Sequence, residues 1–341
     1  MTKPSLLELP PGVQLVYLAE GGANVIYRFV SAPVKSHRKD PKMPLPVVID
    51  SPDNRAVSAS FRGKLLRLRK ETAADLSYKE IVHNFNNTVR PLFNPEELVD
   101  QTLIHLPEGL IQRCNELLRM DELNGKRPKK RHGGYLCLNE PFGLLITDMT
   151  TFDDPSATLA ELKPKWLTQS PSAPGSAHRC RTCALREMKN HEARRLGQKE
   201  QRSFCPLDLM SDRFDNVLRA TSFIKGCNDR TRLAYILHRN PTLQKLQSLQ
   251  KSRREVGLLG PPPHSREVSL DMTLRDCTMF IKIPRDEISP VEIRLGDLDL
   301  KTGAGGKAKY WRDLENTLIG GGWYRGSNSQ GPSECALSQR Q

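Results

Sequence analysis

The sequence predicts an α+β protein built as two lobes. Its 341 residues are too many for one simple core and suit two. In the first part of the chain, strand-like and helix-like segments alternate. In the second part, helical segments come before strands that have acidic residues at their ends. We expect an N-terminal lobe with an antiparallel sheet over residues 1–150, a larger α/β lobe over 151–326 and a disordered tail over 327–341.

The composition narrows the class of partner. A net charge of +13 implies an acidic one: nucleic acid, a membrane surface or a polyphosphorylated small molecule. Aromatic residues make up only 6%, and the sequence has no basic stripe interleaved with aromatics of the kind that binds single strands. No apolar run is long enough to span a membrane, and the first residues lead into no signal-peptide core. We therefore expect a nuclear or cytoplasmic protein that does not bind membranes.

The first elements are two strands over residues 13–30 that flank a glycine turn. Small residues at a hairpin tip let backbone N–H groups approach a phosphate, although most such turns are only turns. The residues concerned are Gly21, Gly22, Ala23 and Asn24. Residues 31–60, rich in Pro, Ser and charge, predict a loop insert.

The next strand, residues 64–70, alternates and places basic side chains, including Arg67, on one face. A cation on the strand after a glycine hairpin is the arrangement that nucleotide kinases use to hold phosphates, and a polar outer face is the alternative. Segments 76–89 and 95–120 are predicted to be helical. Residues 126–132 form a basic run that suits a nuclear localisation patch, a solvated loop or a substrate-facing rim. Residues 142–149, with Asp148 near their end, would suit a hinge whose backbone faces an adenine.

The stretch Glu161-Leu162-Lys163-Pro164-Lys165 carries the sharpest local pattern. Alternation at period two places Glu161, Lys163 and Lys165 on one side of an extended chain. Pro164 lacks an N–H, so this strand should be an edge or an end. Two lysines on one face, next to an acid, suit the binding of an anion of high charge density. The alternative is that this stretch is an ordinary solvent-exposed Lys-Pro-Lys turn.

A cysteine cluster follows. The eight cysteines of a chain without a secretory signal favour a reduced compartment, where such clusters are more often metal ligands than disulfides. Cys180 and Cys183 form a Cys-x-x-Cys pair that, with Cys205 and one histidine, suits tetrahedral zinc. His191 lies about 12 Å along a continuous helix from Cys183, which favours His178 as the fourth ligand. Ordinary free cysteines remain the alternative, and a redox disulfide is less favoured because no thioredoxin-like strand precedes the pair.

The C-terminal part contains two acids next to strand segments. Helices are expected near 211–224, 233–253 and 308–319. Asp276 precedes one β-rich run and Asp297 ends another. Phosphoryl transfer needs such a pair, one carboxylate to accept the proton of the attacking hydroxyl and one to hold magnesium.

Several motifs taken together resemble one family, the inositol-pentakisphosphate 2-kinases, in a fungal-type form. The chain has a Glu-Leu-Lys-Pro-Lys stretch at 161–165, a Cys-Pro-Leu-Asp-Leu box at 205–209, Asp-Cys-Thr at 276–278, Asp-Leu-Asp-Leu-Lys at 297–301 and a Gly/Ala-Asn loop at 20–24. Their order and approximate spacing match the family across residues 13–325. Each motif alone is weak, but several in order are specific.

The resemblance implies a two-lobed kinase-like fold that uses ATP and Mg²⁺. The implied reaction moves the γ-phosphate of ATP to the axial 2-hydroxyl of inositol 1,3,4,5,6-pentakisphosphate and gives phytic acid. Asp276 matches the catalytic base, Asp297 the magnesium ligand and Arg67 an ATP-phosphate contact. Residues that match substrate-phosphate ligands are Arg131, Lys163, Lys165, Lys189, Asn228, Arg232, Lys301 and Tyr310.

Two features qualify the match. Where the family has a second Asn after Asn228, this chain has Asp229, so the following contact could come from Arg230 or Arg232. A zinc ion, if bound, would be structural. We expect a monomer that holds no stable nucleic acid.

A different class, a basic zinc-containing nucleic-acid-binding protein, would also account for the charge and the cysteines. The two acids discriminate between these classes, because carboxylates beside phosphate-facing lysines weaken simple binding. A protein kinase is disfavoured, since the sequence has neither His-Arg-Asp-x-x-x-x-Asn nor Asp-Phe-Gly.

Overall fold

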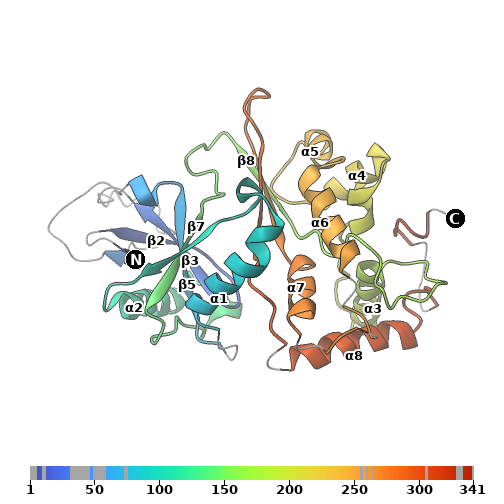
Figure 1. The fold of residues 1–341 in the computed structure, drawn as a ribbon, viewed down its shortest axis with the longest axis horizontal. Coiled ribbons are helices and arrows are strands. Elements are labelled where there is room, and N and C mark those ends of the chain that lie inside the picture. Colours follow the sequence, from blue (N-terminus) through green and yellow to red (C-terminus); the bar gives the residue numbers. More distant parts are fainter. Residues whose placement is uncertain are drawn as a thin grey trace. The chain divides into compact units, whose positions relative to one another are not determined.

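The computed structural model divides the chain into two compact units (Figure 1). Unit 1 is Met1–Asn86 with Val99–Asp148, and unit 2 is Asn87–Leu98 with Met149–Gln341. The structure describes residues 6–9, 13–30, 47–48, 59–72, 76–253, 256–258, 260–262, 265–303, 306–327 and 333–339. Most of the loop insert expected over 31–60 lies outside the described residues.

The segment 87–98 belongs to unit 2 because its contacts are there. The Lys245 ammonium lies 2.7 Å from the Glu97 carboxylate, and an Arg294 guanidinium nitrogen donates to the Leu98 carbonyl at 2.9 Å. The expected division at residue 150 therefore differs from the observed one in this segment.

Unit 1 is built on a mixed seven-stranded sheet in the order β1-β6-β7-β5-β3-β2-β4. Its strands are β1 (Leu7–Glu8), β2 (Gln14–Glu20), β3 (Asn24–Val30), β4 (Val47–Val48), β5 (Lys64–Arg69), β6 (Gln101–His105) and β7 (Phe142–Thr147). The pairings are antiparallel except that of β1 with β6, which is parallel. The prediction of an antiparallel sheet is therefore wrong at the edge formed by β1.

Two helices accompany this sheet, α1 (Tyr78–Asn84) and α2 (Leu110–Leu123). Leu110, Cys114 and Leu118, spaced at i, i+4 and i+8 on α2, are buried in the same core as strand residues such as Leu15 and Leu66. This apolar stripe explains why the second half of the expected helix 95–120 is helical.

The first half of that expected helix is wrong. A short 3₁₀ turn, Pro95–Glu97, leads into β6, which pairs with β7 along its whole length. Gln101 and Ile104 are buried, and Leu106-Pro107 ends the strand before α2 begins. Pairing in the sheet satisfies the backbone here better than an isolated helical turn.

Unit 2 contains a three-stranded antiparallel sheet in the order β10-β9-β8. Its strands are β8 (Thr158–Leu162), β9 (Thr278–Ile283) and β10 (Glu292–Gly296). β8 lies at the edge, as the missing N–H of Pro164 predicted.

The helices of unit 2 are α3 (Arg181–Arg195), α4 (Phe214–Thr221), α5 (Arg230–Leu237), α6 (Pro241–Ser252), α7 (Arg266–Leu274) and α8 (Lys307–Gly320). The single helix expected over 233–253 is divided into α5 and α6. Arg239 adopts φ +54°, Asn240 caps α6 and Pro241 starts it. α6 packs beside α7, and α3 beside α8 (Figure 1). Among the described helices, none combines the length and apolar character that a membrane crossing requires.

Candidate active site

The outer strand β8 and the residues after it place the lysines. Ala160, Leu162, Pro164 and Trp166 are buried, whereas Glu161, Lys163 and Lys165 face a cavity. The predicted period of two therefore persists past the end of the strand. It stops at Lys165, whose φ is +58°, in the left-handed region that costs a non-glycine residue about 1–2 kcal/mol.

Asp276 lies in the short link between α7 and β9, accepts a hydrogen bond from Lys165 and forms an ion pair with Lys301. Lys165 Nζ is 2.6 Å from Asp276 Oδ1, and Lys301 Nζ is 3.3 Å from Asp276 Oδ2. The Lys301 backbone is fixed by its N–H, which donates to Thr273 Oγ1 at 2.9 Å on α7. The candidate base and two candidate phosphate ligands are thus one cluster.

Lys163 connects the two acids. Its Nζ donates to Asp297 Oδ2 at 2.7 Å and to the Asp276 carbonyl at 2.8 Å. Asp297 follows β10 and has φ +58°, so the chain turns sharply as the strand ends. The structure therefore brings together five of the residues that the sequence singled out, Lys163, Lys165, Asp276, Asp297 and Lys301.

The charges of this cluster shift the pKa values of two of its members, Asp276 and Lys163. Burial opposes ionisation of Asp276, but the Lys165 hydrogen bond and the charges of Lys165, Lys301 and Lys163 hold its pKa below the ordinary value. Burial also disfavours charged Lys163, yet Asp297 and Asp276 raise its pKa. At neutral pH Asp276 is consequently ionised and Lys163 protonated, so Asp276 can accept a proton and Lys163 can bind an anion.

A basic cavity of about 780 Å³ opens beside β8. Three of the predicted substrate residues line it, Lys163, Lys165 and Lys189. So do three cations that sequence reasoning missed, Arg186, Arg202 and Lys225. Glu161 also lines it, and burial raises the pKa of this carboxyl above its ordinary value.

Only one of the missed cations had a sequence signal. Arg186 stands three residues before Lys189, so both lie on one face of α3. Arg202 and Lys225 come from separate loops that meet the cavity through the tertiary fold. Gly226 makes the approach of Lys225 feasible: its φ is +91°, and a Cβ there would lie 2.0 Å from the Leu159 carbonyl oxygen.

The remaining predicted substrate residues lie in different surroundings. Asn228 and Arg230 line an adjoining cavity of about 670 Å³ together with Lys225 and Gly226. Arg232 instead donates to the carbonyls of Arg285 and Asp286, at 3.3 and 2.8 Å. Of the two open alternatives, Arg230 is therefore the residue that shares a cavity with Asn228.

Asp229 and Tyr310 are the two further positions that the sequence raised. The Asp229 carboxylate accepts from the Arg232 N–H at 2.9 Å and so caps α5, which gives this unexpected acid a local role. Tyr310 lies on α8 with its side chain 57% exposed.

The candidate nucleotide residues lie in unit 1. The turn between β2 and β3 is closed by a Gly21 N–H to Asn24 carbonyl bond of 2.9 Å, and the Lys70 N–H donates to the Ala23 carbonyl at 2.8 Å. Asn24 Oδ1 accepts from the Tyr78 hydroxyl at 3.1 Å. Arg67 is buried on β5. Asp148, directly after β7, donates its N–H to the Gly63 carbonyl at 2.9 Å.

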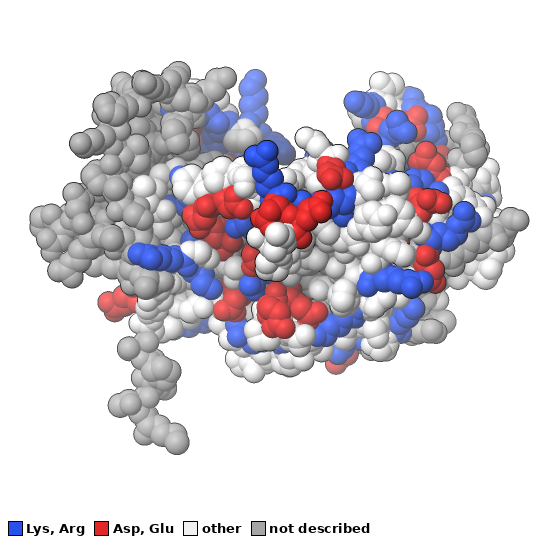
Figure 2. Space-filling view, turned by 90° about the horizontal axis from the view of Figure 1, so that it is seen from above, with Lys and Arg blue, Asp and Glu red and all other residues white. Residues whose placement is uncertain are grey.

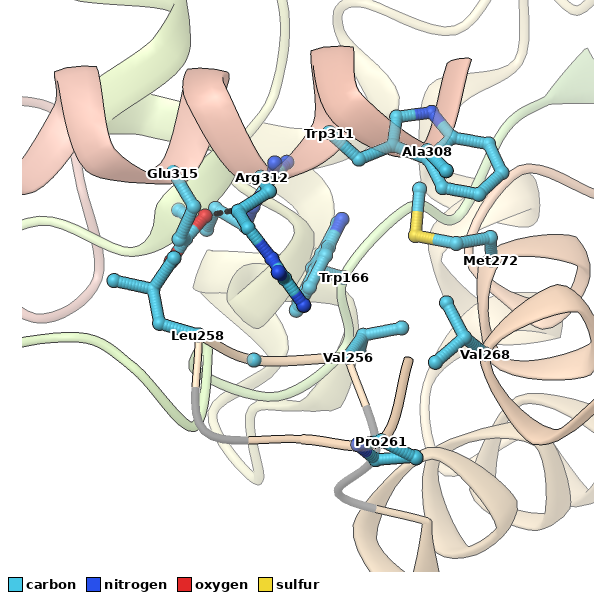
Figure 3. A pocket seen from close by; sticks show the side chains of 12 residues that line it. Trp166, Val256, Leu258, Pro261, Val268, Met272, Ala308, Trp311, Arg312 and Glu315 are labelled. Carbon is cyan, nitrogen blue, oxygen red and sulfur yellow. Dashed lines mark hydrogen bonds and ion pairs between the residues drawn. The ribbon is translucent and has the colours of Figure 1, made fainter. Parts of the chain in front are cut away.

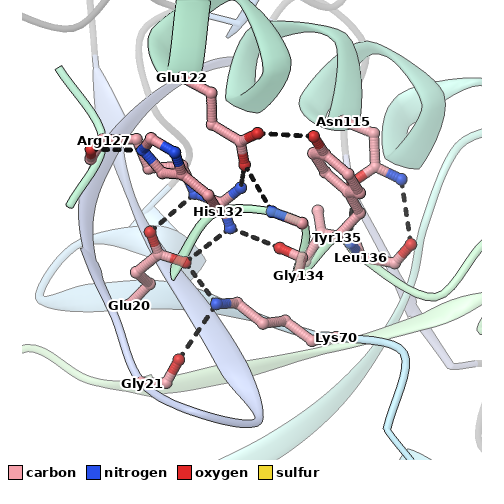
Figure 4. Close-up of polar contacts among 11 residues, drawn as sticks. Glu20, Gly21, Lys70, Asn115, Glu122, Arg127, His132, Gly134, Tyr135 and Leu136 are labelled. Carbon is pink, nitrogen blue, oxygen red and sulfur yellow. Dashed lines mark hydrogen bonds and ion pairs between the residues drawn. The ribbon is translucent and has the colours of Figure 1, made fainter. Parts of the chain in front are cut away.

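A buried ion network supports the glycine turn (Figure 4). The Glu20 carboxylate accepts from Arg127 and from Lys70, and Lys70 also donates to the Gly21 carbonyl at 3.1 Å. Burial favours neutral Glu20, but the two cations lower its pKa. Arg127 donates as well to Glu122 and to the Gly134 carbonyl, which anchors the basic run.

Arg131, on that basic run, lies next to the turn. A Cβ built on Gly22 would be 3.8 Å from an Arg131 guanidinium nitrogen. The candidate ATP turn and one candidate substrate arginine are therefore neighbours within unit 1.

Four cysteine thiols meet in unit 2. Cys180, Cys183, Cys205 and Cys335 are all buried, and their sulfur atoms lie within 4.8 Å of one another. Cys180 and Cys335 each place Sγ 3.8 Å from Cys205 Sγ. Tetrahedral zinc with Zn–S bonds of about 2.3 Å requires sulfur separations of about 3.8 Å, so the geometry fits a closed structural zinc site.

The fourth member of this cluster is Cys335 and not His178, which corrects the expected ligand set. Cys335 lies 130 residues after Cys205, in the segment expected to be a disordered tail. The structure describes residues 333–339 of that segment, and Cys335 is fully buried. No spacing rule reaches that far along a chain, so the sequence had no local signal for it.

Comparison with known proteins supplies a family. The family described as inositol-pentakisphosphate 2-kinase matches residues 17–226 and 240–317. An inositol-pentakisphosphate 2-kinase of Yarrowia lipolytica is 29% identical over 285 residues, which cover 76% of this chain and 85% of the relative. A protein of the same name from Debaryomyces hansenii is 23% identical over an alignment 390 positions long, which covers 90% of this chain and 91% of the relative.

Proposed function

The chain belongs to the inositol-pentakisphosphate 2-kinase family, and on that premise we propose that it transfers the γ-phosphate of ATP to the 2-hydroxyl of inositol 1,3,4,5,6-pentakisphosphate. The product is inositol hexakisphosphate. The observation that carries the proposal is the joining of Asp276, Asp297 and three lysines in one cluster beside a basic cavity.

Asp276 is the general base of the proposed reaction. The 2-hydroxyl O–H bond breaks as its oxygen bonds to the γ-phosphorus, and the proton passes to the Asp276 carboxylate. The bond between the γ-phosphorus and the bridging oxygen breaks, and its electron pair leaves with ADP. The lowered pKa of Asp276 supports this role, because it keeps the carboxylate ionised at neutral pH.

The basic cavity is the proposed substrate site. Five phosphates carry about −8 to −10 at neutral pH, so the ligand needs several fixed cations. Lys163, Lys165 and Lys189 line the cavity with the newly found Arg186, Arg202 and Lys225. Each charge-assisted hydrogen bond to phosphate would contribute about 1.5–3 kcal/mol.

ATP and its metal are assigned to other residues. The turn at Gly21, Gly22, Ala23 and Asn24, together with Arg67, would hold the nucleotide phosphates, and Asp148 would lie near the adenine. Asp297 would hold Mg²⁺, which suits a single carboxylate that leaves room for water and phosphate oxygens. The bound metal would neutralise charge on the ATP phosphates.

Zinc is proposed as a structural ion held by the four cysteines. Cys180 caps α3, the helix that carries Arg186 and Lys189. Cys205 directly follows Phe204, which also lines the cavity, and it occupies the N-cap position of the short 3₁₀ helix that comes next. The metal would therefore brace two walls of the substrate cavity without taking part in the chemistry.

The nucleic-acid-binding alternative gains no support from the surface in view. On the face drawn in Figure 2, acidic and basic side chains are interspersed, so the net charge of +13 does not form one continuous basic surface there.

The test is turnover of a panel of inositol phosphates with ATP and magnesium, followed by anion-exchange chromatography. Inositol 1,3,4,5,6-pentakisphosphate should be converted to the hexakisphosphate, and phosphorus NMR should locate the new phosphate on carbon 2. Absence of turnover by well-folded protein would remove the proposal.

A further inference from the structure

Gln250 is a buried polar side chain that neither the charge pattern nor the motifs singled out. It lies in the last turn of α6 and is 1% exposed. Its carbonyl oxygen accepts from the Leu167 N–H at 2.9 Å. Its amide nitrogen donates to the Lys165 carbonyl at 2.9 Å and to the Leu274 carbonyl at 3.0 Å. Both amide hydrogens are therefore engaged, as a buried amide requires.

These three bonds join two segments of the candidate site. Lys165 and Leu167 flank Trp166 in the lysine stretch, and Leu274 ends α7 two residues before Asp276. Lys165 has a left-handed backbone, which a non-glycine residue keeps only where its surroundings determine it. Gln250 bonds the carbonyl of this strained residue and the N–H two positions later, so it fixes the direction in which the Lys165 side chain leaves the chain.

The backbone of Gln250 holds the other side of the pair. Its carbonyl accepts from an Arg275 guanidinium nitrogen at 3.1 Å, and Arg275 is 2% exposed and directly precedes Asp276. The same guanidinium lies 4.7 Å from the centre of the Trp166 ring. One residue of α6 thus contacts the neighbours of Lys165 and the neighbours of Asp276.

Trp166 completes the joint between the two segments. Its ring stacks on Arg181 as well, at 4.4 Å, and packs with Val256 and Val268. The cavity beside it, drawn in Figure 3, measures about 50 Å³ and is walled by apolar side chains such as Met272 and Trp311. That space is too small for a phosphorylated sugar, so the Trp166 region is a support and not a second substrate site.

We propose that Gln250 is a positioning residue for phosphoryl transfer. It holds Lys165 and Asp276 so that Lys165 Nζ stays 2.6 Å from Asp276 Oδ1. The inference rests on the proposed function, because it assigns Asp276 as the base. A misplacement of about 1 Å in such an arrangement lowers rates by about a hundredfold. Gln250 touches neither substrate nor metal in this scheme.

The test replaces Gln250 with Met, which keeps the length of the side chain and removes its three hydrogen bonds. We expect kcat to fall about 10- to 100-fold while the KM for ATP changes less than about twofold. Gln250→Glu should give an intermediate kcat, because burial favours the neutral acid, which retains one donor and one acceptor. Gln250→Glu also serves as the test if Gln250→Met does not fold.

The matched control is Gln247→Met. Gln247 lies one turn earlier on α6 and donates to the Leu167 carbonyl at 3.1 Å, so it binds the same loop. The Gln247→Met variant should be less stable than the wild type, but its kcat should fall by no more than about twofold. Equal losses of kcat in the two variants would reduce Gln250 to a general structural role and overturn the inference.

A double-mutant cycle separates action through Lys165 from independent action. In a Lys165→Met background, Gln250→Met should lower kcat by less than about threefold, because the Lys165–Asp276 pair whose separation Gln250 is proposed to hold no longer exists. The full loss in that background would overturn the inference. Wild-type kcat in folded Gln250→Met would also overturn it, whereas failure of the unmodified chain to turn over pentakisphosphate would instead overturn the proposed function.

Discussion

Arg127 and Glu20 form a two-pronged ion pair in unit 1, with Arg127 Nε 2.8 Å from Glu20 Oε1 and Arg127 Nη2 2.9 Å from Glu20 Oε2. Both side chains are 1% exposed. The pair lies directly before the glycine turn, and Lys70 bonds both the Glu20 carboxylate and the Gly21 carbonyl. The shape of the turn therefore depends on charges brought from β2, from the residue after β5 and from the basic run.

Removing one partner should destabilise the protein strongly. Arg127→Met removes one of the two cations that lower the pKa of the buried Glu20 carboxylate and leaves Lys70 as the other, and a broken buried pair costs about 3–5 kcal/mol. Urea unfolding should show this loss. Lys309→Met, which breaks the exposed pair of Lys309 with Asp313, is the control and should cost less than about 1 kcal/mol. Equal effects would show that the network contributes no more than a surface pair.

Asp276→Asn should abolish transfer while ATP still binds. Loss of a general base lowers the rate by about 10²–10⁴. Single-turnover kinetics and nucleotide titration would separate the two quantities. Asp313→Asn, which changes an exposed side chain of α8, should leave the rate unchanged. Near-normal turnover by Asp276→Asn would assign the base to another group.

The lysines of the β8 stretch should act on the inositol phosphate and not on ATP. Lys163→Ala and Lys165→Ala should raise KM for pentakisphosphate by about tenfold or more, since each removes a charge-assisted contact. Arg202→Ala and Lys225→Ala should do so as well, because they line the same cavity. Lys251→Ala, exposed on α6, is the control. A parallel rise in KM for ATP would place these residues at the nucleotide.

The pH dependence should follow the Asp276–Lys165 pair. The lysines lower the pKa of Asp276, so in the wild type the activity should persist below the ordinary titration range of an aspartate and fall only as the carboxylate protonates. Lys165→Met removes the cation that contributes most to this lowering, so the pKa should rise and the acidic limb of the kcat profile should move to higher pH. An unmoved limb would show that another group controls it.

Metal analysis should find about one zinc per chain, held by the four cysteines. Cys335→Ser should lower zinc content and thermal stability, because it removes one of the four ligands. Chelation should lower stability before it lowers turnover, since the proposed role of the metal is structural. Cys137→Ser is the control, because Cys137 belongs to unit 1 and is not a member of the cluster. If zinc-free protein had full stability, the four cysteines would be ordinary buried thiols and not metal ligands.

The sequence by itself determined the features that depend on local spacing. Alternation placed Glu161, Lys163 and Lys165 on one face, and the missing N–H of Pro164 placed β8 at an edge. The ordered motifs identified the family, and the Cys-x-x-Cys pair pointed to a metal site. Such signals survive folding because side-chain direction follows from the backbone period within one element.

Only the tertiary structure decided what distant segments share. Residues 101–105 resembled the start of a helix and became a strand, because pairing with β7 satisfied their backbone. Cys335, and not the expected His178, is the fourth member of the cysteine cluster, and Arg202 and Lys225 line the basic cavity from separate loops. Gln250 is the clearest case: one amide on α6 bonds the backbones of Lys165 and Leu274, which are far apart along the chain. The path of the chain in space, and not its local period, brings such groups within hydrogen-bonding distance.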